Sequence, residues 1–471
     1  MNRLLITNIG TLAGIDQGRS CLRGAEMAHL ETIHDAWLLI EDGRIKEWGN
    51  APYPVPEGAA IPGGPSSNEI SLGAETTVFD AKGGTVLPSF CDSHTHIVYA
   101  GSREGEFVDK IQGLSYAEIA RRGGGILNSA DRLHEMSEDE LYEQAMHRVW
   151  EIIRKGTGAV EIKSGYGLNT ADELKMLRVI RRIKQTAPLC VKSTFLGAHA
   201  VGRAYQGRQA DYVDLIVNEM IPEVGHQGLA DFIDVFCDEG FFTPEETARI
   251  LEAGATYGMR GKIHGQELAD SGGVEVAVRH HALSVDHLES MTDRDVEILL
   301  EARSKRQEAR GKGQEARDKK QKASGEGQEA RGKGQEARGE GQETIPTALP
   351  GTSFFLNMPF APARKIIHAG LPLAIASDYN PGSTPSGDMK FVVSLACIKM
   401  RLMPAEAINA ATINTAAAMG ISHEYGSIGK GKVANLIVTE PIPSIDFLPY
   451  AYTSPVIRQV VLQGRLIPMT D

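Results

Sequence analysis

Cysteine is scarce in this sequence and shows no spacing that would suggest a disulfide framework. The 471 residues contain five cysteines, which lie far apart and form no Cys-x-x-Cys pair: Cys21, Cys91, Cys190, Cys237 and Cys397. An odd number of scattered thiols is typical of a reduced, intracellular protein. The composition therefore excludes a small disulfide-stabilised secreted domain, and we expect a cytoplasmic protein.

Long apolar runs and excess positive charge are also missing. No stretch approaches the roughly 18 uninterrupted apolar residues that a membrane-spanning helix needs. The N-terminal run MNRLLITNIGTL is broken by Asn8 and Gly10 and is too short and polar for a signal peptide. The net charge of −12 argues against nucleic acid or an anionic membrane as the main partner. A small-molecule partner is therefore expected.

Both ends of the chain carry β-strand signals. Near the N-terminus, LLITNIGTL and AWLLIEDGRIKEWG are rich in β-branched and apolar residues, and Asp42-Gly43 is typical of a hairpin turn. Strand patterns return near the C-terminus in GSIGKGKVANLIVTE and SPVIRQVVLQGRLI. We predict one small β-sandwich built from residues 1–84 and 420–471, with residues 85–419 inserted between its two halves.

The middle of the chain alternates between helices and short apolar strands. The segments EDELYEQAMHRVWEIIRKG and TADELKMLRVIRRIKQTAP have helical patterns. The strand-like segments are GAVEIKSGYG, CVKSTFLGAHA, FIDVFCDEGFF, RGKIHGQE, ALSVDHLE, TSFFLN and PLAIASDYN. This alternation indicates parallel βαβ units and predicts an α/β fold, either a (β/α)8 barrel or a doubly wound open sheet. Nearly every strand ends in a polar residue, which favours a barrel with its site at the C-terminal rim.

A candidate metal site starts at the strand that ends in His94-Thr95-His96. Residues two apart in an extended strand share one face, so these imidazoles can bind one ion, although on their own they could equally be two solvated histidines. The ends of later strands supply further candidates: His264, Glu267, His287 and Asp378. Three imidazoles, or two imidazoles and a carboxylate, leave an open position for water on Zn²⁺ or a similar ion. The pattern therefore predicts hydrolysis by a metal-bound hydroxide.

Several segments resemble the imidazolonepropionase family of the amidohydrolase superfamily. They are DSHTHIVYAGSRE, EIKSGYGL, FLGAHA, IHGQELADSGG, DHLE, LPGTSFFL and ASDYNPGS, and they occur in the expected order over most of the chain. The resemblance implies a TIM-type barrel that hydrolyses the cyclic amide C–N bond of 4-imidazolone-5-propanoate. The product would be N-formimidoyl-L-glutamate, in histidine degradation. The resemblance also implies a homodimer.

The same resemblance implies roles for individual residues. One zinc or iron ion would be held by His94, His96, His264 and Asp378. His287 would orient the metal-bound water or exchange a proton with it, and Glu267 would hydrogen-bond the substrate and shuttle protons. Arg103 would bind the propionate carboxylate, which suits its planar guanidinium. The other implied substrate contacts are Tyr166, His199, Asn380, Gly382 and Ser383.

Two other functions fit parts of the sequence. A related amidohydrolase that deaminates an aminated heterocycle would share the histidine and aspartate pattern. Arg103, Tyr166 and His199 favour a small carboxylated ring over that alternative. A metal-free interaction protein that keeps the barrel and binds partners through its charged repeats is an alternative from another class. The complete set of ligands argues against it, because a scaffold has no need of them.

The charged repeats occupy residues 301–343 and contain almost no apolar side chains. They read as the heptads QEARGKG, QEARDKK, QKASGEG, QEARGKG and QEARGEG. A period of seven is that of a coiled coil, but only alanine is available for the core positions and glycine recurs. We therefore predict that residues 303–343 are a disordered insert or a fraying helix. Their place between a helix and the next strand predicts that they lie on the rim opposite the active site.

Overall fold

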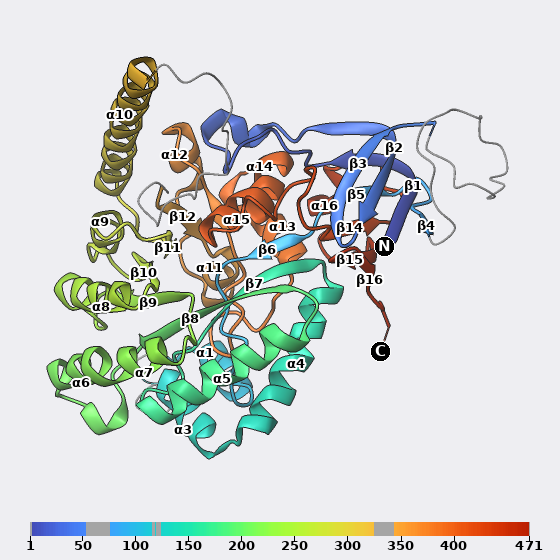
Figure 1. Ribbon diagram of the computed structural model, residues 1–471. Coiled ribbons are helices and arrows are strands. Elements are labelled where there is room, and N and C mark those ends of the chain that lie inside the picture. Colours follow the sequence, from blue (N-terminus) through green and yellow to red (C-terminus); the bar gives the residue numbers. More distant parts are fainter. Residues whose placement is uncertain (1, 53–75, 115–117, 119–123, 325–342, 471) are drawn as a thin grey trace.

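The alternating strands and helices build a barrel of eight parallel strands in the middle of the chain (Figure 1). The computed structural model describes residues 2–52, 76–114, 118, 124–324 and 343–470. Around the barrel the strands are β6 (Phe90–Asp92), β7 (Thr157–Lys163), β8 (Cys190–Ala198), β9 (Phe232–Cys237), β10 (Arg260–Gly265), β11 (Ser284–His287), β12 (Ile345–Ala348) and β13 (Ala374–Ile375). The first and last strands meet beyond their ends, where the Asp378 N–H donates to the His94 carbonyl at 2.9 Å. The predicted (β/α)8 barrel is confirmed, and this closure excludes the open sheet.

Helices flank the barrel strands and begin where the sequence provides caps. At α4 the Ser137 hydroxyl accepts a hydrogen bond from the Glu140 N–H, and at α5 the Asn169 side chain accepts one from the Asp172 N–H. None of the helices in the described ranges combines the length and the apolar composition needed to span a membrane. The helices are α1 (Glu104–Ile111), α3 (Ile126–Glu135), α4 (Glu138–Arg154), α5 (Thr170–Thr186), α6 (Gln209–Leu215), α7 (Ile221–His226), α8 (Pro244–Thr256), α9 (Gly273–Arg279), α10 (Asp293–Ser324), α11 (Pro350–Leu356), α12 (Ala363–His368), α13 (Met389–Met400), α14 (Pro404–Asn409), α15 (Thr415–Ala418) and α16 (Phe447–Tyr450).

The seventh barrel strand lies earlier in the chain than we predicted. The segment TSFFLN, predicted as a strand, belongs to α11, and β12 is formed by the residues IPTA just before it. Pro350 begins α11, where a missing N–H costs nothing, so the aromatic residues after it continue as a helix. This helix brings Thr352 and Ser353 to the barrel rim, where their hydroxyls donate to Asp378 and Glu289.

Strands from both termini form a second, mixed sheet beside the barrel (Figure 1). The Asp42-Gly43 turn has φ angles of 47° and 80°, as its hairpin requires. One apolar cluster contains both Ile45 and Val461, from opposite halves of this sheet, so the sheet folds over a common core. The predicted β unit from both termini is confirmed. Its strand order is β16 (Arg465–Leu466), β15 (Ile457–Leu462), β14 (Leu436–Thr439), β5 (Thr85–Pro88), β1 (Arg3–Ala13), β2 (Thr32–Glu41) and β3 (Arg44–Asn50), with β4 (Thr76–Asp80) also paired to β1.

The apolar run before the His94-Thr95-His96 segment contributes one strand to each of the two sheets. Strand β5 pairs with β1 and β14 of the terminal sheet, whereas β6 pairs with β7 of the barrel. Ser89 lies between them, and its N–H donates to the Asn435 carbonyl at 2.9 Å. We therefore propose that the boundary between the two units, predicted after residue 84, lies at Ser89.

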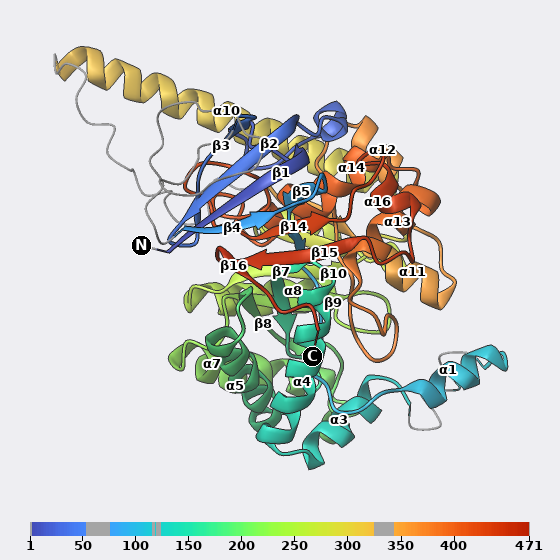
Figure 2. The same cartoon turned by 90° about the vertical axis from the view of Figure 1, so that its right-hand side faces the viewer.

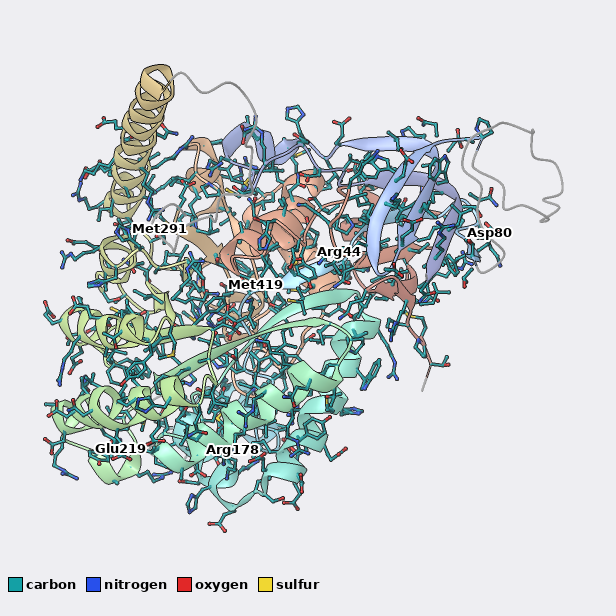
Figure 3. The ribbon with its side chains drawn as sticks, viewed as in Figure 1. Arg44, Asp80, Arg178, Glu219, Met291 and Met419 are labelled. Atoms are coloured by element: carbon teal, nitrogen blue, oxygen red, sulfur yellow. The ribbon has the colours of Figure 1, made fainter. Side chains whose placement is uncertain are left out.

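Helix α10 projects from the body of the molecule and carries the first part of the charged repeats (Figures 1 and 2). Met291, which is buried just before the helix, lies at its base (Figure 3). Residues 303–324 are helical where we predicted disorder or a fraying helix, because Ala, Glu, Gln, Lys and Arg are all strong helix formers. The rest of the predicted insert up to residue 342 lies outside the described residues.

Candidate active site

Three histidines meet at the C-terminal rim of the barrel. His94 and His96 follow β6 and His264 lies near the end of β10; all three are buried, and one ring nitrogen of each lies within 4.8 Å of the others. The Nε2 atoms of His94 and His96 are 3.3 Å apart, and each is 3.6 Å from Asp378 Oδ1. His264 Nε2 is buried and has no hydrogen-bond partner in the described part of the chain. The four residues predicted as metal ligands therefore come together.

The protonation of these groups suits a metal ion. Burial lowers the pKa of His94 well below its usual value, and the charge of Lys163 lowers it further. Burial has the same effect on the pKa of His96. Neutral imidazoles are the form that binds metals. Burial also raises the pKa of Asp378, and a cation beside it would stabilise the carboxylate. The donor set of imidazole nitrogens and a carboxylate oxygen fits a divalent transition metal.

Two buried aspartates hold the far nitrogens of the histidine rings. His94 Nδ1 donates to Asp286 Oδ2 at 2.7 Å, and His264 Nδ1 lies 3.0 Å from Asp234 Oδ2. A proton held on Nδ1 leaves the lone pair on Nε2, where it can bind a metal. The hydrogen bond to Asp286 therefore fixes the orientation and the tautomer of the His94 ring, and Asp234 lies close to the far nitrogen of the His264 ring.

The aspartates belong to a buried ionic cluster that the sequence analysis missed. Lys163 Nζ lies 2.6 Å from Glu161 and 2.7 Å from Asp234, while Lys262 contacts Glu161 and lies 3.6 Å from Asp286. Although burial opposes ionisation of Asp234, His264 and Lys163 hold its pKa well below the usual value. Charged residues inside otherwise apolar strands were the available signal, because burial is costly unless such charges are paired.

A tight turn after β13 aims Asp378 at the histidines. Asp378 has a φ of +55°, and its Oδ2 accepts hydrogen bonds from Thr352 Oγ1 at 2.6 Å and Ser383 Oγ at 3.1 Å. Its other oxygen, Oδ1, therefore faces the imidazoles. Asn380 Oδ1 accepts hydrogen bonds from the Gly382 and Ser383 N–H groups at 2.7 and 2.8 Å. In the structure these three predicted substrate contacts form the turn that supports Asp378.

Beside this group, the imidazole of His287 lies between the carboxyls of Glu267 and Glu289. His287, the last residue of β11, has its Nε2 3.6 Å from Glu267 Oε2 and its Nδ1 3.7 Å from Glu289 Oε2. The loop after β10 places Glu267, whose N–H donates to Asp238 Oδ2 at 2.8 Å. Burial raises the pKa of Glu267 well above its usual value, and the charges of Glu289 and Asp378 raise it further. Glu267 therefore tends to keep its proton.

Arg103 lies at the start of α1, against the turn after β13. Its Nε and Nη2 groups donate to Glu106 Oε2 at 2.9 and 2.6 Å, which fixes the guanidinium. A side chain at Gly382 would contact the Arg103 guanidinium and displace it from this position. The positive charge of Arg103 contributes to lowering the pKa of His199. Arg103 therefore lies within electrostatic reach of the histidine group.

Tyr166 and His199 line the same region from β7 and β8. The His199 ring stacks on His96 with centroids 5.1 Å apart and lies 5.9 Å from His264, while Tyr166 lies 5.8 Å from His96. His199 Nδ1 donates to the Gly165 carbonyl at 3.0 Å, which leaves Nε2 as an acceptor. Burial lowers the pKa of His199 to about 3, so the ring is neutral. All the residues predicted for the site thus lie at one rim.

The sequence matches one protein family and several named relatives over most of its length. The profile of the amidohydrolase family matches residues 85–467. The imidazolonepropionase of Christiangramia forsetii is 48% identical over 98% of this chain and 100% of its own length. That of Flavobacterium johnsoniae is 48% identical over 98% of this chain and 99% of its own. Among solved structures, E. coli guanine deaminase matches with a TM-score of 0.68 at 13% identity over 100% of both chains, a likeness of fold alone.

Proposed function

We propose that this chain, which belongs to the amidohydrolase family, hydrolyses the ring C–N bond of 4-imidazolone-5-propanoate to give N-formimidoyl-L-glutamate. The observation that carries the proposal is the meeting of three buried histidines, Asp378 and the protonatable carboxyl of Glu267 at one rim. The near-full-length similarity to imidazolonepropionases supports this substrate. In the reaction the carbonyl carbon gains the oxygen of water, the C–N bond breaks, and the ring nitrogen gains a proton.

The proposal includes one zinc or iron ion, held by His94, His96, His264 and Asp378. When bound, this ion would act as a Lewis acid at the carbonyl and lower the pKa of a nearby water molecule. The chain's own contribution is to keep the donor atoms in place. Asp286 and Asp234 hold the far sides of two rings, while Thr352 and Ser383 hold the far oxygen of Asp378.

Glu267 and His287 are suited to proton transfer. Because burial raises the pKa of Glu267 well above its usual value, its carboxyl tends to keep a proton, which it can donate to the leaving nitrogen. His287 is held neutral because burial lowers its pKa, and its Nε2 lies 3.6 Å from Glu267. We propose that Glu267 protonates the leaving group while His287 orients the attacking water and accepts its proton.

The remaining predicted residues would bind the substrate. A guanidinium fixed by Glu106 can form a paired hydrogen bond with the propionate carboxylate, and Arg103 is placed to do so. His199 Nε2, left as an acceptor, can receive a hydrogen bond from a ring N–H. Tyr166 offers a buried aromatic face beside His199. The turn from Asn380 to Ser383, which lies against Arg103, would contact the substrate beside it.

The proposal also includes a cytoplasmic homodimer. All five cysteines are free thiols, as expected in a reducing compartment. The resemblance to imidazolonepropionases supports the dimer. Light scattering on the purified protein tests it, since a mass of one chain at micromolar concentration would rule the dimer out.

A comparison of substrates tests the proposed reaction. Purified, metal-loaded protein is incubated with freshly generated 4-imidazolone-5-propanoate, and loss of the ring's ultraviolet absorbance is followed. Guanine, an aminated heterocycle, is offered in parallel and ammonia release is measured. We expect rapid ring opening and no ammonia. Release of ammonia from guanine with the imidazolone left intact would show that the substrate is wrong.

Removal of most of the charged repeats is expected to leave turnover unchanged. The Arg303 guanidinium donates to the Gly370 carbonyl, before β13, so the insert leaves the barrel on the rim opposite the site. Arg23 Nε lies 2.7 Å from Glu343 Oε2 at the other end of the insert. Replacing residues 314–341 by a short Gly/Ser linker keeps both contacts. We expect kcat and KM within about twofold of the full chain, because surface connections tolerate changes in length.

Steady-state kinetics and metal analysis of the shortened protein decide this prediction. A tenfold loss of kcat at equal metal content, or failure to obtain metal-loaded protein, would contradict it.

A further inference from the structure

Glu289 is buried beside His287, and neither the ligand set nor the proton transfer described above uses it. Its side chain is 1% exposed, and its Oε1 accepts a hydrogen bond from Ser353 Oγ at 2.9 Å. Its Oε2 lies 3.7 Å from His287 Nδ1. Within the described ranges, neither of these two buried atoms has a hydrogen-bond partner. Buried polar atoms are rarely left unpaired, so each is the natural partner of the other.

We propose that Glu289 is a positioning residue that determines which ring nitrogen of His287 carries the proton. The inference rests on the proposed function and deepens it. When Glu289 is ionised it accepts a hydrogen bond from Nδ1–H, and the lone pair on Nε2 then faces Glu267 and the reacting water. A shortening of the 3.7 Å contact completes this hydrogen bond. Hydrogen bonds of catalytic groups are often long without substrate and tighten in the complex.

The backbone between the two residues is held in an unusual conformation. His287 and Leu288 have φ angles of 85° and 73°, in a region that residues other than glycine rarely adopt. The turn is fixed by hydrogen bonds from the Leu288 N–H to the Gly265 carbonyl at 3.2 Å and from the Ser290 N–H to the Gln266 carbonyl at 2.7 Å. Such strain is typically retained at functional sites. Here it places the Glu289 carboxyl on the Nδ1 side of the ring.

Four other carboxyls act on this pair, those of Glu267, Asp234, Asp238 and Asp378, together with Lys163 and the rings of His199 and His264. Burial, reinforced by the charges of Asp378 and Asp238, raises the pKa of Glu289 to about 8. A neutral imidazole carries one proton on either Nδ1 or Nε2, so the pair holds two protons while the Glu289 carboxyl is neutral and one proton after it ionises. At low pH the neutral carboxyl donates to Nδ1, and the ring proton lies on Nε2. As pH rises the carboxylate forms, the ring proton moves to Nδ1, and Nε2 becomes a base. The pH profile of activity should therefore have a rising limb, along which activity increases with pH.

Substitution of Glu289 by glutamine tests the proposal. The amide cannot ionise, and when its oxygen accepts from Ser353, its NH₂ donates to His287 Nδ1 and keeps the ring proton on Nε2. We expect Glu289→Gln to lower kcat on the order of 100- to 1000-fold, the scale of a lost general base, with KM within about threefold. The rising pH limb should disappear. Glu289→Asp retains the carboxylate and should restore part of kcat together with the limb.

Nitrogen NMR of histidine-labelled protein reports the tautomer directly. The His287 signals are assigned by their loss in His287→Gln. We expect the ring proton on Nδ1 in the wild type above the limb and on Nε2 in Glu289→Gln at every pH. The matched control is Glu406→Gln, which removes another buried carboxylate; Glu406 lies on α14, away from the site, and is paired with Arg364 of α12. This control should keep kcat within about twofold, as substitutions outside the site generally do.

Each outcome decides the proposal. A Glu289→Gln protein with normal metal content and a wild-type pH profile would overturn it, and so would a loss of kcat without a change of tautomer. If Glu289→Gln fails to fold, Ser353→Ala is studied in its place. A mixture of His287 tautomers and a shifted rising limb of the pH profile would then support the proposal. Unchanged NMR spectra would overturn it. If the wild type leaves the imidazolone intact, the proposed function fails, whereas the NMR experiment still decides the role of Glu289.

Discussion

Replacement of Glu267 by glutamine is expected to lower kcat by roughly 1000-fold, the scale of general acid catalysis, while KM and metal content change little. The amide keeps the shape of the side chain but cannot give a proton to the leaving nitrogen. Glu267 lies beside His287 and is not one of the four proposed ligands, so the metal should remain bound. Stopped-flow or steady-state assays of ring opening at matched metal loading measure the effect.

The pH dependence separates this role from that of Glu289. Because the raised pKa of Glu267 keeps its carboxyl protonated, activity that depends on the acid form falls as pH rises above that pKa. The wild type should therefore have a falling limb as well as the rising one, with apparent pKa values that belong to the coupled pair. Glu267→Gln should lose the falling limb and Glu289→Gln the rising one. A Glu267→Gln enzyme within tenfold of the wild type, with both limbs intact, would contradict the assignment.

Replacement of His264 by alanine is expected to remove both the metal and the activity. His264 supplies one of three buried nitrogens that lie within 4.8 Å of one another, and its Nδ1 lies 3.0 Å from Asp234 Oδ2. Loss of an outer partner of a metal ligand typically costs 10- to 100-fold in affinity, and loss of the ligand itself should cost more than roughly 100-fold. Metal analysis after dialysis and the ring-opening assay measure the two losses separately.

A second histidine provides the control for this change. His134 is paired with Asp172 but its side chain is 68% exposed, and it lies on α3 outside the histidine group. His134→Ala should retain its metal and its activity. A His264→Ala protein that retains both would exclude the proposed ligand set.

The sequence predicted that these histidines would come together, because their signals are local. A His-x-His pair at the end of a strand, and single polar residues at the ends of later strands, follow directly from the geometry of a barrel. The cluster beneath them could not be predicted in the same way. Lys163, Asp234 and Asp286 lie on three different strands, and their pairing depends on a register that only the closed barrel defines.

Other features depended on backbone details that the residues alone do not reveal. The aromatic and β-branched residues of TSFFLN fit either a strand or a helix, and the helix follows from Pro350 and from packing at the rim. Glu289 reaches the His287 ring only because two consecutive residues have positive φ angles, for which DHLE carries no signal. The composition of the repeats did not predict how far α10 continues into them.

A metal titration tests the central claim most directly. Metal-stripped protein is titrated with zinc or ferrous iron, and the rate of ring opening of freshly generated 4-imidazolone-5-propanoate is measured at each addition. If His94, His96, His264 and Asp378 form a single site for this reaction, the rate rises in proportion to the metal and levels off at one ion per chain. Full activity without metal, a rise that continues to two ions, or an intact ring at full loading would contradict the claim.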